Sequence, residues 1–143
     1  MLVAQILKTK GDAVFTVSPE ETVRQAAARL GERRVGAVVV MGAGGAVAGI
    51  LSERDVARAV GEEGAAALDR SVEAVMTRDV VYAEPEHTVD QLLALMTDRR
   101  IRHLPVCRSD RLVGIVSIGD LVKVKIAEVE AEAADLKAYI SAG

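Results

Sequence analysis

An internal duplication runs through this chain, and it restricts the possible folds more than any other feature. Residues 15–23, FTVSPEETV, align with residues 81–89, VYAEPEHTV. Further along the chain, residues 49–55, GILSERD, align with residues 114–120, GIVSIGD. The sequence therefore predicts one structural unit that is built twice and packed against itself.

The two copies differ in length at one predicted turn. Residues 42–46, GAGGA, stand where the second copy has only residues 108–111, RSDR. Differences in length are usual in surface loops. The glycine-rich stretch also resembles part of a dinucleotide-binding loop, but the second copy lacks it and no third glycine follows at the required spacing. We therefore interpret it as a hairpin turn.

Each copy is predicted to fold as strand, helix, strand, strand and helix. Thr22 with Gln25, and Thr88 with Gln91, have the spacing of a capping box, in which two side chains satisfy free backbone N–H groups at a helix start. Alternating and continuous apolar runs predict the strands. The expected elements are first strands at 14–17 and 80–83, helices that begin after Thr22 and Thr88, hairpins of 37–41 with 47–51 and of 104–107 with 112–117, and closing helices that begin at Ser52 and Ser117.

These elements divide the chain into four segments. We expect a first repeat at 8–62, a connecting segment at 63–75, a second repeat at 76–126 and an amphipathic helix at 127–143. Within the connection, Ser71 is predicted to cap a short helix that continues to residue 76.

The last segment carries an apolar stripe at helical spacing. Such a stripe requires a partner, which can be the chain's own domain or the same helix of a second copy in a homodimer. The stripe contains Ile126, Val129, Ala133, Leu136 and Ile140.

Composition excludes several classes of function. A net charge of -3 and an aromatic content of 2% argue against a nucleic-acid-binding protein, which needs clustered cations or stacking platforms. The single Cys107 cannot form an intramolecular disulfide, and the first residues lack the pattern of a signal peptide. Residues 35–51 carry no charge but contain several glycines and are too short for a membrane span. These features predict a cytoplasmic protein with no membrane partner.

The duplicated G-I-x-S-x-x-D motif is the strongest candidate for a binding site. Ser-x-x-Asp is itself a helix-capping box, so Ser52 with Asp55, and Ser117 with Asp120, are explained by capping alone. The two roles are compatible, because a helix start favours anions and an acidic residue at such a position can accept both hydroxyls of a ribose. The chemistry suggests a nucleotide ligand.

Together, these motifs resemble a pair of cystathionine β-synthase (CBS) domains, also known as a Bateman module. The resemblance rests on residues 17–23, VSPEETV, on residues 34–37, RVGA, with their counterpart 100–106, RIRHLPV, and on the duplicated S-x-x-D motif. It covers about residues 8–126 and points to the stand-alone bacterial type. It implies an α/β fold with mixed sheets, in which two βαββα repeats pack in a pseudo-twofold arrangement and a C-terminal helix follows.

The resemblance also implies the ligand and the residues that bind it. CBS pairs commonly hold AMP, ADP or ATP, and sometimes NAD(H) or S-adenosylmethionine, in clefts between the repeats, with AMP the first expectation here. By position, Asp55 and Asp120 would bind ribose hydroxyls, with Ser52 and Ser117 on ribose or phosphate. The remaining pocket residues would be Lys10, Val14, Phe15, Val35, Gly36 and Ala37 from the first copy, and Thr77, Val80, Val81, Ile101, Arg102, His103 and Pro105 from the second.

The two copies differ where a phosphate would bind. His103 and Arg102 would reach the phosphate of the ligand at Asp55, whereas the matching residues 36–37 are Gly and Ala. At one further pair of matching ligand-binding positions the charge is instead in the first copy, since Arg54 matches Gly119. We therefore expect two unequal sites, with phosphate favoured at Asp55 and a larger or weaker ligand at the other. A plainly packed or surface histidine is the alternative for His103.

The leading hypothesis is a non-catalytic regulatory module that senses cellular energy through bound adenine nucleotide. It would signal by conformational change or dimerisation to an effector protein that the sequence does not name. One alternative is a structural dimerisation domain in which the Ser and Asp residues only cap helices. A nucleotide-processing enzyme is the other, although no nucleophile, activated base or metal-ligand spacing accompanies the Ser-x-x-Asp motifs. We therefore expect no catalytic cofactor and no metal.

Overall fold

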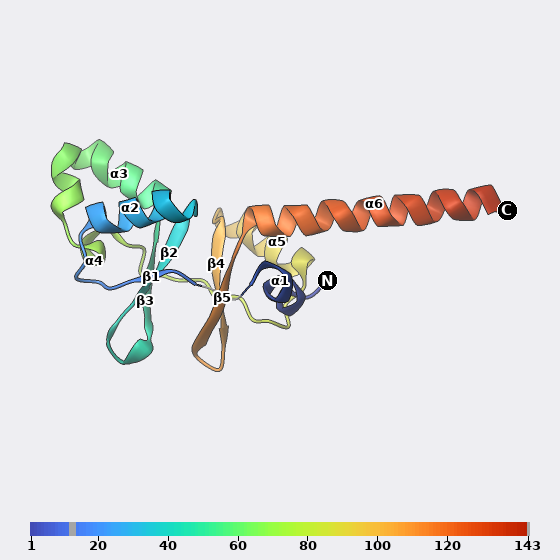
Figure 1. The fold of residues 1–143 in the computed structure, drawn as a ribbon, viewed down its shortest axis with the longest axis horizontal. Coiled ribbons are helices and arrows are strands. Elements are labelled where there is room, and N and C mark those ends of the chain that lie inside the picture. Colours follow the sequence, from blue (N-terminus) through green and yellow to red (C-terminus); the bar gives the residue numbers. More distant parts are fainter. Residues whose placement is uncertain (12–13, 143) are drawn as a thin grey trace.

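The computed structural model describes residues 1–11 and 14–142 and contains two small α/β units side by side, from which a long C-terminal helix projects (Figure 1). The first unit contains β1 (Thr16–Val17), α2 (Val23–Arg33), β2 (Ala37–Met41), β3 (Val47–Ser52) and α3 (Glu53–Glu63). The second contains α5 (Val89–Arg99), β4 (His103–Arg108), β5 (Arg111–Ser117) and α6 (Ile118–Ala142). Two short helices, α1 (Val3–Lys10) and α4 (Val72–Val75), precede the units, and single-turn helices lie at Ala43–Gly45 and Gly64–Asp69. The predicted α/β class and the paired repeats are confirmed.

The predicted hairpins are present in both units. Strand β2 pairs antiparallel with β3, and β4 pairs antiparallel with β5. Strand β1 adds to β2 in the parallel direction. The predicted turn at 42–46 is one short helical turn in which Gly44 has a φ of 76°, a conformation that suits glycine.

The predicted first strands are too long in both units. In the first, only Thr16–Val17 forms a strand. In the second, residues 80–83 form a single bridge, in which Ala83 donates to the Pro105 carbonyl at 2.9 Å and accepts from the Cys107 N–H at 2.9 Å. Val80 instead donates to the nearby Arg78 carbonyl, so the chain turns there. The apolar residues predicted a buried strand, but a strand also requires backbone hydrogen bonds to a neighbouring strand along its length.

The predicted capping boxes form as expected. Thr22 accepts from the Gln25 N–H at 3.1 Å and donates its own N–H to the Gln25 amide oxygen at 2.9 Å, and Thr88 with Gln91 repeats both distances. Ser71 precedes α4 as predicted, but its side chain makes no capping hydrogen bond. These local bonds fix the helix starts.

Helices α1 and α4 are equivalent. Helix α1 docks against the second unit and α4 docks against the first, at matching positions of the duplication. Val3 donates to the His87 carbonyl at 2.9 Å, and Ala4 donates to the Pro85 carbonyl at 2.9 Å. In the first unit, Val72 donates to the Glu21 carbonyl at 2.8 Å and Glu73 to the Pro19 carbonyl at 3.0 Å, which are the matching positions. The duplication therefore includes these helices, although their spacing from the shared proline differs.

The two hydrophobic cores show that these helices cross over. Val3, Ile6 and Leu7 of α1 pack in the core of the second unit, with residues of α5, β4 and β5. Val72 and Met76, which precede the second repeat, pack in the core of the first unit. The segment in front of each repeat therefore completes the core of the other, which ties the two units together.

Helix α6 corrects the expectation of a separate terminal helix. The closing helix of the second repeat and the amphipathic segment form one continuous helix, Ile118–Ala142. Leu121 is fully buried, whereas Val129, Leu136 and Ile140 are exposed. Of the two partners expected for the apolar stripe, the chain's own domain is therefore excluded for these residues.

Candidate functional site

A cleft with a volume of about 580 Å³ lies between the two repeats. This volume is within the range of small-molecule sites in proteins. The first unit contributes Gly36, Ile50, Ser52, Glu53, Arg54, Asp55, Ala57 and Arg58; the connection and the second unit contribute Thr77, Asp79, Val80, Val81, Arg100, Ile101, Arg102, His103 and Pro105.

Asp55 is the central acidic residue of this cleft, and its position follows from its place in the first turn of α3. Its Oδ2 accepts from the Ser52 N–H at 3.0 Å and from the Ser52 hydroxyl at 3.1 Å. The Thr77 hydroxyl, from the segment that crosses between the units, lies 3.1 Å from Oδ1 and 3.3 Å from Oδ2. Asp55 is only 7 % exposed, so these bonds hold the carboxylate in one orientation. Asp55 therefore forms the predicted capping box with Ser52 and also lines the cleft.

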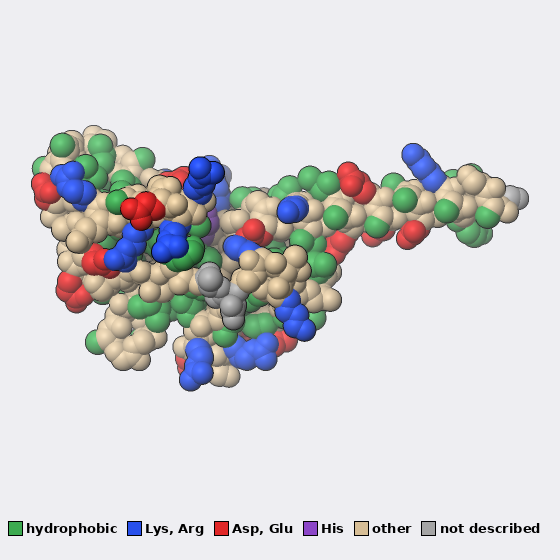
Figure 2. All heavy atoms as spheres, in the orientation of Figure 1, with side chains coloured by type: hydrophobic (Ala, Val, Ile, Leu, Met, Phe, Trp, Pro, Cys, Tyr) green, Lys and Arg blue, Asp and Glu red, His purple; other side chains and the backbone are tan. Residues whose placement is uncertain are grey.

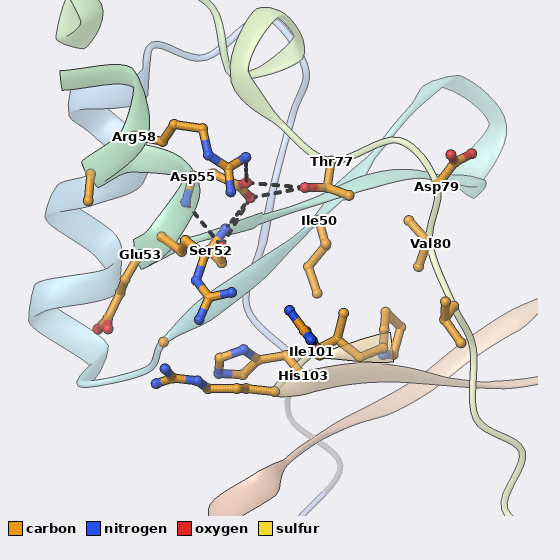
Figure 3. Close-up of a pocket in the computed structure, with 17 residues that line it drawn as sticks. Ile50, Ser52, Glu53, Asp55, Arg58, Thr77, Asp79, Val80, Ile101 and His103 are labelled. Atoms are coloured by element: carbon orange, nitrogen blue, oxygen red, sulfur yellow. Dashed lines mark hydrogen bonds and ion pairs between the residues drawn. The ribbon is translucent and has the colours of Figure 1, made fainter. Parts of the chain in front are cut away.

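The second unit supplies the opposite wall. Figure 3 shows Ile101 and His103 facing Ser52, Asp55 and Thr77 across the cleft. Ile101, with the nearby Val80, gives this wall an apolar surface that could hold a flat base. The cleft therefore has a carboxylate at one side and an apolar and imidazole surface at the other.

Gly36 makes room for His103. A Cβ atom at Gly36 would lie 2.7 Å from the His103 Nε2. The sequence showed only that Gly36 lacks the charge of its counterpart Arg102. The structure gives the physical reason for the difference, because a side chain at position 36 would displace the imidazole of the other repeat.

Cations surround the cleft on several elements. Arg54 and Arg58 lie on α3, and Arg100 and Arg102 lie just before β4. Figure 2 shows Lys and Arg side chains beside a histidine in the gap between the units. Arg58 also lies 3.9 Å from the Asp55 Oδ1, which is a distant ion pair. This arrangement favours an anionic ligand group near the Asp55 carboxylate.

The pKa of His103 is lowered from its ordinary value of 6.5, chiefly because burial penalises the charged imidazolium. The positive charges of Arg102 and Lys10 lower it further. The carboxylates of Glu53 and Asp120 oppose this shift without reversing it. His103 is therefore a neutral hydrogen-bonding group at neutral pH in the unliganded cleft.

This shift predicts a pH dependence of stability. Because the unfolded chain binds a proton at His103 more readily than the folded chain, we expect stability to fall as the pH decreases through about 6.5 and to level off below the folded-state pKa. Urea midpoints of wild type and His103→Gln, measured from about pH 8 to about pH 5 in phosphate-free buffer, test this expectation. The variant should lose this part of the pH dependence. Superimposable profiles would show that His103 does not contribute.

The equivalent position in the second repeat is closed by an ion pair. Lys10 donates to the Asp120 Oδ2 at 2.6 Å and to the Ile115 carbonyl at 2.9 Å. Burial alone would raise the pKa of Asp120, but hydrogen bonds from Lys10 and Ser117 and the Lys10 charge outweigh it and lower the pKa below 3.8. Stability from Asp120 is therefore present above pH 3.8 and is lost only as the pH falls through the lowered folded-state pKa.

The two Asp residues occupy equivalent positions with different partners. Thr77 and Lys10 both come from the segment that crosses from the other repeat, but Thr77 offers Asp55 a neutral hydroxyl and Lys10 offers Asp120 a cation. The carboxylate of Asp120 therefore has a close cationic partner at 2.6 Å, whereas the cation beside Asp55 is the more distant Arg58 at 3.9 Å. The Lys10 contact adds to the differences between the two positions that are visible in the sequence, and unequal ligand binding stays a prediction.

The remaining predicted site residues lie outside the first cleft. Phe15 and Val35 pack against the core of the first unit, and the Phe15 ring lies 4.4 Å below the Arg33 guanidinium. Ala37 is buried in β2. Val14 is partly buried and Gly119 is exposed, and both lie outside the cleft. So do Lys10 and Asp120, which form the ion pair, and Ser117, whose N–H donates to Asp120.

Several lining residues were not predicted. Arg58 lies one helical turn after Arg54, so its place on the same face of α3 could have been read from the spacing. Arg100 ends α5 with a φ of 55°, as its counterpart Arg34 ends α2 with a φ of 53°. Asp79 lies in the crossing segment, and no local signal places it at the cleft.

Two negative findings concern the described residues alone. In 1–11 and 14–142, no group of three His, Cys, Asp or Glu side chains is arranged to hold a metal ion. Over the same residues, no helix is both long enough and apolar enough to cross a bilayer.

Comparison with known proteins identifies the family. The family model for the CBS domain matches residues 3–62 and 72–127, which include helices α1 and α4. A mitochondrial CBS domain-containing protein of Arabidopsis thaliana is 34% identical over 99% of this chain and 72% of its own length. The crystal structure of a CBS-domain containing protein from Agrobacterium tumefaciens is 46% identical, with a TM-score of 0.85 over 87% of this chain and 92% of that one.

One solved relative is described with bound ligands. The crystal structure of a CBS domain pair in complex with 5-methylthioadenosine and S-adenosyl-L-methionine has a TM-score of 0.80 and 25% identity, over 90% of this chain and 98% of that one. Its two ligands are both adenosine derivatives. The two family matches, one for each copy of the duplication, and the shared fold show that this chain belongs to the CBS domain family as a tandem pair.

Proposed function

We propose that this protein is a non-catalytic regulatory module that binds an adenine nucleotide in the cleft at Asp55. The carboxylate of Asp55 carries the proposal, because it is held by Ser52 and Thr77 and opens onto the cleft between the repeats. A carboxylate in this position can accept both ribose hydroxyls. The adenosine ligands of the related CBS pair agree with this chemistry.

The same cleft can hold the other parts of a nucleotide. Ile101 and Val80 provide apolar contact for the base, and His103 with Arg102 provides a donor and a charge for phosphate. Four arginines line this one cleft, which also suits the longer phosphate chains of ADP and ATP, so AMP, ADP, ATP and NAD(H) are the candidate ligands.

The site at Asp120 is proposed to bind more weakly. A ligand there must displace or accommodate Lys10, whose ammonium already bonds the carboxylate. Its ribose would therefore compete with an existing charged hydrogen bond. Isothermal titration is expected to show one class of tighter sites and a second weaker class or none.

A ligand panel tests the proposed function. AMP, ADP, ATP, NAD⁺, NADH and S-adenosylmethionine are each added to the pure protein, and thermal unfolding is followed. A ligand at about 100 times its dissociation constant should stabilise the folded state by about 2.7 kcal/mol. A panel without any shift would favour the alternative of a structural dimerisation domain, in which the Asp residues act only as caps.

The enzyme alternative has a separate test. Each nucleotide is incubated with the protein for many hours and then analysed by chromatography. We expect every nucleotide to be recovered unchanged. The family model that matches is that of the CBS domain, which is not a catalytic domain. Among the residues that line the cleft, the helix-capping Asp55 has no nucleophile beside it that a general base activates. Turnover of any one of them would contradict the regulatory proposal.

A further inference from the structure

Helix α6 has two apolar faces, and among residues 1–11 and 14–142 the chain covers only one of them. On the inner face, Leu121 is fully buried and Val124 packs against the core of the second unit. On the same side, Lys125 pairs with Asp90 at 2.9 Å, and Glu128 accepts from the Met1 amino group at 2.9 Å. These contacts fix how the helix is rotated on the body.

The outer face follows the spacing of a coiled coil. Its residues succeed one another at alternating intervals of four and three positions, which is the a and d pattern of a heptad repeat. Exposure of its larger side chains lies between 41% for Val122 and 67% for Ile140. The residues of this outer stripe are Val122, Ile126, Val129, Ala133, Leu136 and Ile140.

The outer stripe points away from the body. In a heptad, Leu121, Val124 and Glu128 take positions c and f, which lie opposite a and d on the helix. Figure 1 shows α6 extending past the rest of the molecule, and Figure 2 shows hydrophobic side chains along the projecting part. Along the projecting part, the described residues of the globular part therefore leave the stripe uncovered.

The charges beside the stripe favour a second copy of this chain in the parallel orientation. Lys125 and Glu132 take g positions, and Glu130 and Lys137 take e positions. In a parallel pair each g residue faces the e residue of the next heptad on the other helix. Glu132 would then face Lys137 of the second copy, whereas Lys125, at the position opposite Glu130 of the second copy, already pairs with Asp90 of its own chain.

The antiparallel orientation brings like charges together. With a and d residues in contact, it places Glu132 opposite Glu132 of the second copy and Glu130 opposite Glu130. It also places Lys123 opposite Lys137. Like charges at these positions are unfavourable, so the pattern discriminates between the two orientations.

We propose that two copies of this chain associate through the outer stripe of α6 as a parallel, in-register coiled coil. The stripe spans about three heptads, which is short for an isolated coiled coil but is supported by helix α6 being anchored on each body. The two CBS pairs then lie at the same end of the coil. The inference does not depend on the nucleotide site.

Solution mass and one seam substitution test the interface. Sedimentation velocity of the full chain should give twice the chain mass of 15.1 kDa. Leu136→Glu places a charge in the seam and should raise the dimer dissociation constant by about 100-fold. Since Leu136 is 60 % exposed in one copy, the substitution should leave the thermal unfolding of the monomer unchanged. The matched control Ala131→Glu adds the same charge at position f and should remain dimeric.

A charge exchange tests the pairing. Glu132→Lys and Lys137→Glu should each weaken the dimer, and the double variant should restore it, because the exchanged pair is again opposite in sign. A monomeric wild type, or a dimer unaffected by Leu136→Glu, would overturn the proposal.

Cross-linking tests the orientation. In a Cys107→Ser background, Ile126→Cys and Ile140→Cys should each form a disulfide between two copies of the same variant, since identical a positions face each other only in a parallel, in-register pair. Ala138→Cys, at position f, should not. A disulfide that forms only when Ile126→Cys is mixed with Leu136→Cys would show an antiparallel pair, in which a positions face d positions, and would overturn the stated orientation.

Discussion

Replacing Asp55 by alanine is expected to weaken adenine-nucleotide binding in the first cleft by at least about 100-fold, as measured by isothermal titration. Each hydrogen bond from a ribose hydroxyl to the buried carboxylate contributes about 1.5–3 kcal/mol, and every 1.4 kcal/mol changes the dissociation constant tenfold. Asp55→Asn should weaken binding less, because its amide oxygen can still accept one hydrogen bond. The graded loss identifies the carboxylate itself as the binding group.

Folding must be separated from binding in this experiment. Asp55 also accepts from the Ser52 N–H at the start of α3, so its removal also costs some helix stability. Urea unfolding of each variant measures that cost. Asp90→Ala is the matched control, because Asp90 lies in the first turn of α5 and does not line the cleft. Wild-type affinity in a folded Asp55→Ala protein would show that the carboxylate serves only as a cap.

Replacing Gly49 by alanine is expected to reduce the free energy of unfolding by about 1–3 kcal/mol, the usual cost of overpacking. A Cβ atom at Gly49 would lie 2.6 Å from the Thr77 carbonyl oxygen and 2.8 Å from the Met76 Sδ. The backbone cannot move away without breaking the bonds between Ile50 and Thr77, at 3.0 and 2.9 Å. Because Thr77 holds Asp55, nucleotide binding should weaken as well.

The duplication supplies the control for this substitution. Gly114 is the counterpart of Gly49, but a Cβ atom there would lie 2.6 Å from the Leu7 Cδ2, the free end of a flexible side chain. Leu7 can change rotamer, so Gly114→Ala should cost about 0.5–1.5 kcal/mol. Urea midpoints of the two variants compare these costs. Equal losses, or a larger loss for Gly114→Ala, would contradict the interpretation that Gly49 packs against rigid backbone and Gly114 against a flexible side chain.

Much of the local structure was predictable because its causes are local. The capping boxes at Thr22 and Thr88 mark helix starts within a few residues, and both were found where expected. The hairpins followed from apolar runs separated by short turns. The duplication added a check on each assignment, since an element had to be plausible in both copies. The prediction of a strand failed at residues 80–83, because composition cannot show whether the backbone there has a hydrogen-bonding partner.

Eleven of the 17 residues that line the cleft were predicted from the sequence. The resemblance to CBS domains pointed to Asp55, Thr77 and His103, and the structure brings all three to one cleft. It did not show that Lys10 would pair with Asp120, because that contact joins residues that are distant in sequence. The contributions of Arg58 and Arg100 likewise depend on how α3 and the loop before β4 face each other.

By itself the sequence determined the repeated unit, the order of its elements, the helix caps and the family, because these depend on spacing between nearby residues. Only the tertiary structure decided that α1 and α4 each complete the core of the opposite unit, since that depends on which apolar faces fit together. The same packing brings Thr77 to Asp55 and Lys10 to Asp120. It thereby gives Asp55 a neutral hydroxyl partner and Asp120 a cationic one, a difference that depends on contacts between the repeats.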